Sequence, residues 1–215
     1  MKRETRKYAV PGGCFLAAFV LWTVLLCFAD HQAIGPQGSA VGFAGLNGYV
    51  HRLTGVHMAL YDLTDHLSLI PLLTASCFGI LGLSQWIKRK QLRKVDFSIL
   101  VLGGFYVVVC GLFLFFETCV INYRPILIGG ILEASYPSST TVLVLCVMPT
   151  AGIQLHSRIR NSGLRCIVTL LIGLFTAFMI VARLVSGVHW ITDIIGGMLL
   201  SAGLVFLYRA ICRTF

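Results

Sequence analysis

Apolar residues run along the chain in six long stretches that are separated by polar connections. Each stretch contains about 16 to 23 residues, and about 20 are needed for a helix to cross a bilayer. We therefore predict an all-α fold, a six-transmembrane-helix bundle that forms a single integral-membrane domain over residues 1–215. The predicted spans are Tyr8–Ala29, His66–Ile87, Phe97–Cys119, Thr140–Leu155, Cys166–Ser186 and Trp190–Ile211.

The composition agrees with this pattern, because 57% of the residues are hydrophobic and only 12% are charged. With a mean hydropathy of +0.88, the chain is more apolar than a soluble domain of its length needs to be. The first span follows the basic segment "MKRETRK", as the apolar core of a signal peptide would. Because its apolar run of about 22 residues exceeds the usual length of about 7 to 15, we expect an uncleaved helix.

The basic residues predict the orientation of the chain. The formal net charge is +9, and all but three of the 17 lysines and arginines lie near the termini or in alternate connections. By the positive-inside rule these segments and both termini are cytoplasmic, which predicts a multi-pass plasma-membrane protein. The three exceptions, Arg52, Arg124 and Arg183, then lie on the extracytoplasmic side. Topology accounts for the charge, so we expect no nucleic-acid partner.

Neither the cysteines nor the histidines have the spacing of a metal site. The eight cysteines occur singly and never as a C-x-x-C pair, which also argues against disulfides. His31, His51 and His57 lie in the long connection Asp30–Asp65, which we expect to be an ordered or interfacial segment. No carboxylates lie at a ligand-like spacing from them. We expect no metal and no other cofactor.

The stretch "ARLVSGVHWITDIIGG" places three ionisable residues in an otherwise apolar region. His189 and Asp193 are four residues apart, so on a helix they share a face and the carboxylate can accept an imidazole N–H. Arg183 precedes them at the end of the fifth span, and a short turn can bring it back towards the pair. Ionisable groups in a membrane are costly and often functional. The alternative is an interfacial arginine beside a histidine and an aspartate that begin a helix.

Two further segments, "NYRP" and "YPSSTT", lie on the same predicted side of the membrane. Arg124 precedes a proline, and Ser138 stands at the start of a helix. A helix N-terminus with two arginines makes a site for a tetrahedral dianion such as phosphate. Taken singly, the first segment can be an ordinary loop start and the second an ordinary helix cap.

These residues resemble the three motifs of the type 2 phosphatidic acid phosphatase superfamily, K-x6-R-P, P-S-G-H and S-R-x5-H-x3-D. Arg124 and Pro125 match the first motif, Pro137 and Ser138 the second, and Arg183, His189 and Asp193 the third. The resemblance implies a metal-independent lipid phosphatase with six helices. In it His189 is the nucleophile and Asp193 orients it. Phosphate is held by Arg124, Arg183, Ser138, Ser139 and Thr140.

The chain departs from these motifs, and two of the departures matter. Glu117 stands in place of the lysine, Thr140 in place of the second-motif histidine, and Ala182 in place of the third-motif serine. The lysine is a phosphate ligand and the histidine is the usual general acid. Glu117, seven residues before Arg124, can share its helix face and either orient it through a salt bridge or simply lie near the site behind the phosphate ligands. If desolvation keeps Glu117 or Glu133 protonated, either can donate a proton.

We therefore expect an enzyme that hydrolyses a lipid phosphate or diphosphate in the outer leaflet, with a polyprenyl diphosphate favoured. Transfer of the phosphoryl group to an alcohol or a second lipid is an alternative that the sequence does not separate from hydrolysis. A third possibility is an inactive relative that binds a phospholipid head group or acts as a scaffold. The oligomeric state stays open.

Overall fold

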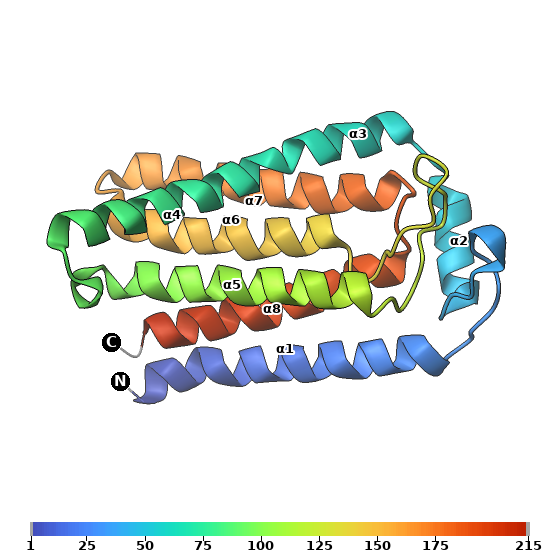
Figure 1. Cartoon of the computed structure of the whole chain (residues 1–215), viewed down its shortest axis with the longest axis horizontal. Helices are drawn as coiled ribbons and strands as arrows, with labels where there is room; N and C mark the ends of the chain where they lie inside the picture. Colours follow the sequence, from blue (N-terminus) through green and yellow to red (C-terminus); the bar gives the residue numbers. More distant parts are fainter. Residues whose placement is uncertain (1, 214–215) are drawn as a thin grey trace.

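The computed structural model of the chain describes residues 2–213 (Figure 1). Within these residues the only extended pairings are isolated β-bridges, so the fold is all-α. The helices are α1 (Lys2–Phe28), α2 (Ala44–Thr54), α3 (Met58–Leu67), α4 (Leu69–Arg89), α5 (Phe97–Thr118), α6 (Ser139–Arg158), α7 (Ser162–Val185) and α8 (Ile191–Cys212), with short 3-10 helices at Pro36–Gly38 and Leu92–Lys94.

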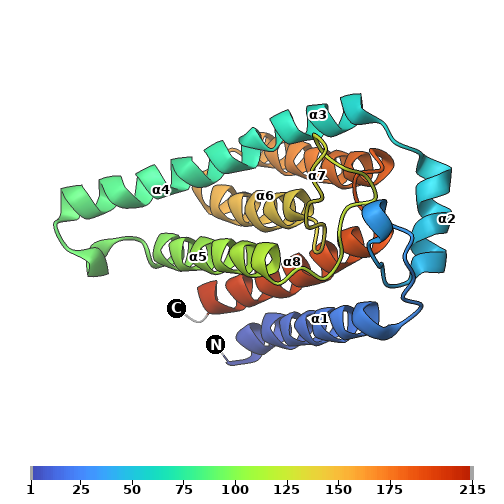
Figure 2. The same ribbon diagram turned by 45° about the vertical axis from the view of Figure 1, so that its right-hand side comes forward.

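Six helical segments within residues 2–213 are long and apolar enough to cross a membrane, which confirms the predicted six-helix bundle. They run side by side, and the first and last helices bring both chain ends to one end of the bundle (Figures 1 and 2). We call this the terminal end; it also holds the α4–α5 and α6–α7 connections. The opposite end, called the distal end, holds the segments 29–57, 119–138 and 186–190.

The second span begins earlier than its apolar pattern indicates. Helix starts at Met58 and continues through α3 and α4 to Arg89, because Ser68 between them keeps right-handed helical backbone angles. The polar residues of α3 end the apolar run, but they do not end the helix. One of them, Thr64, is buried and faces the protein at the distal end.

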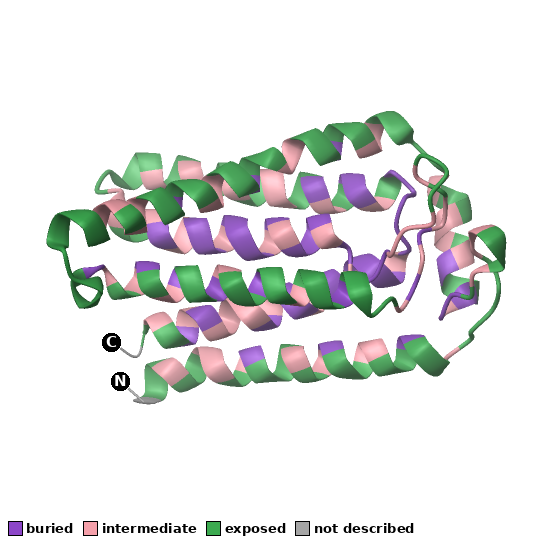
Figure 3. Ribbon diagram, viewed as in Figure 1, coloured by how far each residue is buried: buried purple, intermediate pink, exposed green. Residues whose placement is uncertain are grey.

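Helix α6 is the central helix of the bundle and packs against α4, α5, α7 and α8 (Figures 1 and 3). Its position explains why the fourth span is the least apolar, since most of its surface meets protein instead of lipid. Buried polar groups on α6 bond internally: Gln154 donates to the Tyr208 hydroxyl at 2.5 Å, and Thr150 donates to the Cys146 carbonyl at 2.7 Å.

The distal end is closed by α2, which lies across the bundle (Figures 1 and 2). Asn47 of α2 is fully buried and donates to the Thr192 hydroxyl at 3.0 Å, while its own amide oxygen accepts the Thr192 N–H at 3.3 Å. These two bonds fix α2 to the first turn of α8. The predicted ordered connection therefore contains a helix that holds the start of the last span.

An aromatic side chain anchors the loop 119–138 inside the bundle. The Tyr136 ring lies parallel to that of Phe19 with centroids 6.2 Å apart, and edge-on to that of Phe116 at 6.0 Å. A Cβ on Gly196 would come within 2.4 Å of the Tyr136 ring, so only glycine admits this ring against α8. The loop is thereby positioned directly before α6.

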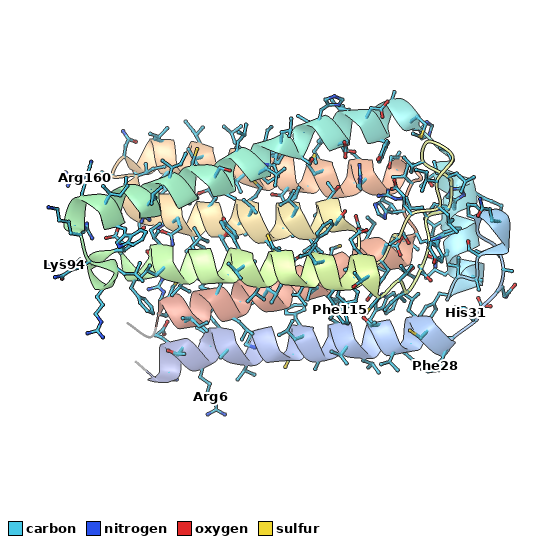
Figure 4. All side chains as sticks on the ribbon, in the orientation of Figure 1. Arg6, Phe28, His31, Lys94, Phe115 and Arg160 are labelled. Atoms are coloured by element: carbon cyan, nitrogen blue, oxygen red, sulfur yellow. The ribbon has the colours of Figure 1, made fainter. Side chains whose placement is uncertain are left out.

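Figure 4 shows Lys94 and Arg160 at the terminal end and His31 at the distal end. By the positive-inside rule we predict that the terminal end is cytoplasmic. Single cysteines at Gln91 and Ile131, each introduced into a chain without native cysteines, test this in intact cells. An impermeant thiol reagent should label the Ile131→Cys variant only. Labelling of the Gln91→Cys variant alone would show that the orientation is the opposite of the predicted one.

Candidate active site

The side chains that the sequence singles out come together at the distal end, from four separate segments. Each of the five principal residues is at least nine-tenths buried, and Thr140 is buried beside them. Figure 3 shows this buried zone where α6, α7 and α8 approach the loop 119–138. The five are Arg124 from the loop, Ser138 before α6, Arg183 in the last turn of α7, His189 between α7 and α8, and Asp193 in the first turn of α8.

The predicted pairing of His189 and Asp193 is present. Nδ1 of His189 lies 3.5 Å from Oδ2 of Asp193, which is an ion-pair distance longer than a hydrogen bond. The same carboxylate oxygen accepts the Trp190 N–H at 2.9 Å and so caps α8. The Asp193 carbonyl accepts the Ser138 N–H at 3.2 Å. The aspartate therefore joins the histidine, the start of α8 and the start of α6.

Arg124 points from the loop towards the histidine. Its Nη1 lies 3.3 Å from Nε2 of His189. Its Nε lies 3.0 Å from Oε2 of Glu133, an ion pair without the alignment of a hydrogen bond. The expectation that Glu117 orients Arg124 is thus wrong within residues 2–213, where Glu133 does so. The reason is that α5 ends at Thr118, so helical spacing does not extend to Arg124.

Arg183 is held by α3, an element that the sequence analysis did not assign to the site. Its Nη1 donates to the Thr64 hydroxyl at 3.0 Å, and its guanidinium lies 4.6 Å from the centre of the Tyr61 ring. The Arg124 guanidinium lies 6.0 Å from the same ring, so one aromatic face is shared by two cations. In the sequence, the three- and four-residue spacing of polar residues in "YDLTDH" could have indicated a helix with one polar face turned towards the site.

The environment of His189 favours its neutral form. Burial lowers its pKa well below the usual value, and the nearby guanidinium groups of Arg124 and Arg183 lower it further. A neutral imidazole carries one proton. With Nδ1 directed at the Asp193 carboxylate and Nε2 at an arginine N–H, the proton belongs on Nδ1 and the free electron pair on Nε2.

The first turn of α6 adds hydrogen-bond donors to the site. The N–H groups of the first helical turn have no partner inside the helix, and they carry the positive end of the helix dipole. Ser139 and Thr140 provide such groups on the wall of the cavity that also holds His189. The structure therefore brings together the three phosphate-holding segments that the sequence predicts.

A cavity of about 320 Å³ opens beside His189 between α4, α5 and α6. Its polar end includes Thr140, Glu117 and Asp65, and the rest of its wall is apolar, with side chains such as Phe113. Glu117 therefore lies on the wall of the same cavity as His189, and Asp65 is a further carboxylate there that the sequence did not indicate. The cavity suits a ligand with a polar head and an apolar tail.

The segment 186–190 between α7 and α8, which we call the link, carries His189 and is held by α2 and the residues that follow it. Gly187 has a φ of +69°, and a Cβ at this position would lie 1.9 Å from the Gly55 carbonyl oxygen. The Ser186 carbonyl accepts the His57 N–H at 3.0 Å, and the His51 ring contacts the Gly187 carbonyl oxygen at 3.1 Å. These histidines support the link, and no group of three possible metal ligands occurs in residues 2–213.

Comparisons with known proteins agree with this arrangement. The family model described as the PAP2 superfamily matches residues 105–214. A crystal structure of a transmembrane PAP2-type phosphatidylglycerolphosphate phosphatase from Bacillus subtilis is similar in fold, with a TM-score of 0.63 and 17% sequence identity over 95% of this chain and 97% of that chain. No curated protein sequence gives a significant match.

The close approach at Gly187 predicts that Gly187→Ala destabilises the protein. The added Cβ meets a backbone oxygen, and the left-handed backbone alone costs about 1–3 kcal/mol for a residue other than glycine. We expect a lower thermal midpoint in detergent. Gly104→Ala is the matched control, because nothing lies within 4 Å of its Cβ position inside α5. Equal midpoints for the two variants would contradict this packing.

Proposed function

The chain belongs to the PAP2 superfamily, and we propose that it is a membrane lipid phosphatase that acts through a phosphohistidine intermediate. The position of His189 carries the proposal. Its Nε2 lies 3.3 Å from the Arg124 guanidinium, and the residue lies on the wall of a largely apolar cavity. A neutral imidazole, two buried guanidinium groups and a helix N-terminus around one point are suited to phosphoryl transfer.

In the first step the Nε2 electron pair attacks phosphorus and the bond from phosphorus to the leaving oxygen breaks. Arg124 and Arg183 stabilise the negative charge on the equatorial oxygens, together with N–H groups of the first turn of α6. Asp193 stabilises the positive charge that develops on the ring and keeps the proton on Nδ1. In this proposal the arginines supply the positive charge that stabilises the transition state, and a metal ion takes no part.

In the second step water attacks the phosphorus of phosphohistidine. The bond between phosphorus and Nε2 breaks, its electron pair returns to the ring, and inorganic phosphate leaves. An alcohol in place of water would give phosphoryl transfer instead. We propose hydrolysis, with water as the acceptor.

The substrate that we favour is a lipid diphosphate such as a polyprenyl diphosphate. Thr140 stands where the superfamily pattern has a histidine that protonates the leaving group, and threonine is no acid at neutral pH. An alkoxide needs that proton, whereas a polyprenyl monophosphate leaves as a much weaker base. Attack at the terminal phosphorus of a diphosphate therefore depends least on the missing group.

For monoesters, two carboxyl groups on the cavity wall are the candidate acids. Asp65 and Glu117 line the same cavity as His189, from α3 and α5. Glu133 is engaged with Arg124 at 3.0 Å and serves to position that guanidinium. With the orientation predicted above, the distal end faces the outer leaflet and the lipid substrate reaches the cavity from that leaflet.

We predict that His189→Ala lowers kcat by at least about a thousandfold, because the nucleophile is lost. Asp193→Asn should leave a weak activity, reduced by about a hundredfold or more, since the orienting group is not itself consumed. The measurement is release of inorganic phosphate from a panel of lipid mono- and diphosphates by the purified protein.

His156→Ala is the control, because this histidine is exposed at the terminal end. It should retain wild-type rates. Unchanged turnover in the His189→Ala variant would rule out the proposed mechanism. A wild-type chain that releases no phosphate from any lipid of the panel would favour an inactive relative, a reading motivated by the missing lysine and histidine.

We also predict that kcat/KM for a polyprenyl diphosphate exceeds that for the corresponding monophosphate or for phosphatidic acid. Thr140→His should narrow the gap by raising monoester turnover, since general acid catalysis contributes about a hundredfold to ten-thousandfold. Thr74→His, at a half-buried position of α4 that does not line this cavity, is the control. If the wild-type enzyme cleaves monoesters as fast as diphosphates, another residue supplies the proton, and Asp65→Asn and Glu117→Gln identify it.

A further inference from the structure

A second hollow lies at the terminal end, away from the catalytic cluster. It is an open groove of about 940 Å³ between α6, α7 and α8. Helix α6 packs against both neighbours, whereas α7 and α8 touch each other little and diverge (Figure 1). We call it the α7–α8 groove.

The length of the α7–α8 groove matches one leaflet of a bilayer. Along α7 it extends from Thr169 to Ile180. At a rise of 1.5 Å per residue these positions are about 17 Å apart. Half of a hydrocarbon core of about 30 Å is about 15 Å. An acyl chain of the adjacent leaflet therefore fits along the groove.

Small residues on α6 and α7 create this space. Gly173 and Ala177 lie on the α7 wall, and Gly152 lies opposite them on α6. A Cβ at Gly173 would meet nothing within 4 Å, so the groove is open at its middle. Apolar side chains such as Phe206 complete the wall.

Two arginines stand where the groove reaches the membrane surface. Arg209 and Arg213 belong to the last turn of α8 and the residue after it, and the groove also exposes His156 and Ser157 at this level. Within residues 2–213 neither arginine has an ion-pair partner. The Arg209 guanidinium lies 4.7 Å from the centre of the Tyr8 ring of α1.

Two acidic residues within residues 2–213 lie at this end, Glu4 in the first turn of α1 and Asp96 before α5, and Asp96 is already paired. Asp96 pairs with Arg89 at 3.1 Å and with Arg158 at 3.6 Å. A hydrogen bond from Gln85, followed by these two arginines, lowers the pKa of Asp96. No aspartate or glutamate lines the groove. Its mouth therefore presents two arginines that have no ion-pair partner among residues 2–213, above an apolar groove.

We propose that the α7–α8 groove binds an anionic phospholipid of the leaflet next to the chain termini. One acyl chain lies along Gly173 and Ala177, and the head-group phosphate contacts Arg209 and Arg213. Basic pockets between membrane helices bind anionic head groups through the same charge attraction. This site lies at the opposite end from His189, so the proposal does not depend on catalysis.

Native mass spectrometry of the full-length protein tests the proposal. The delipidated protein is titrated with phosphatidylglycerol and, separately, with phosphatidylcholine of the same acyl chains. We expect one phosphatidylglycerol to bind at concentrations where phosphatidylcholine does not. The double variant R209Q/R213Q should raise the Kd for phosphatidylglycerol by about 25-fold, because each arginine contributes about fivefold.

The control for charge is K88Q/R93Q, which removes two exposed cations at the same end but outside the groove. It should bind phosphatidylglycerol like the wild type. Equal weakening by both double variants would mean that only the overall charge attracts the lipid, and would overturn the proposed site. Equal wild-type affinity for the two lipids would do the same.

The control for the α7–α8 groove compares substitutions at two glycines that both have open space at the Cβ position. Gly173→Leu fills the groove and should abolish the selective binding, whereas Gly13→Leu on α1 should not. Retained binding in the Gly173→Leu variant would place the lipid elsewhere. A wild-type dimer that Gly173→Leu dissociates would make the occupant a second copy of this chain, against the proposal.

Discussion

Four ionisable side chains share one buried volume at the distal end of an otherwise apolar bundle. Two guanidinium groups, an imidazole and a carboxylate are costly to bury singly. They are tolerated together because each has a partner: Arg124 with Glu133, Arg183 with Thr64 and Tyr61, and His189 with Asp193. The surrounding helices and loops can be understood as the structure that holds these partners in place.

Several backbone segments converge to keep this cluster fixed. The aspartate caps α8 and also accepts the N–H that begins α6, so two central helices start at the same point. The link carrying His189 passes so close to Gly55 that a glycine is required at position 187. Precise positioning of a nucleophile requires support of this kind, because small displacements strongly reduce catalysis.

The two ends of the bundle have opposite surroundings for their positive charge. At the distal end two arginines are buried, and Arg124 contacts His189, an arrangement that suits a small dianionic group. At the terminal end the basic residues lie at the membrane surface, and two of them stand above the α7–α8 groove. In the two proposals, arginine recognises a reacting phosphate at one end and attracts a lipid head group at the other.

The sequence by itself determined the six spans and the pairing of His189 with Asp193. Both depend on local sequence: an apolar run long enough for a bilayer, and a four-residue spacing. The structure keeps the pair although His189 stands just before α8 and not on it. The sequence also placed Glu117 near the site, where the structure puts it on the cavity wall.

Only the tertiary structure decided which side chains hold the arginines. Glu133 reaches Arg124 through a turn of the loop, and Tyr61 and Thr64 reach Arg183 from a helix more than a hundred residues away in the chain. The polar positions of α3 looked like a connection because they interrupt an apolar run, although their helix continues into α4. Contacts between distant segments leave no periodic signal in a single sequence, so packing alone reveals them.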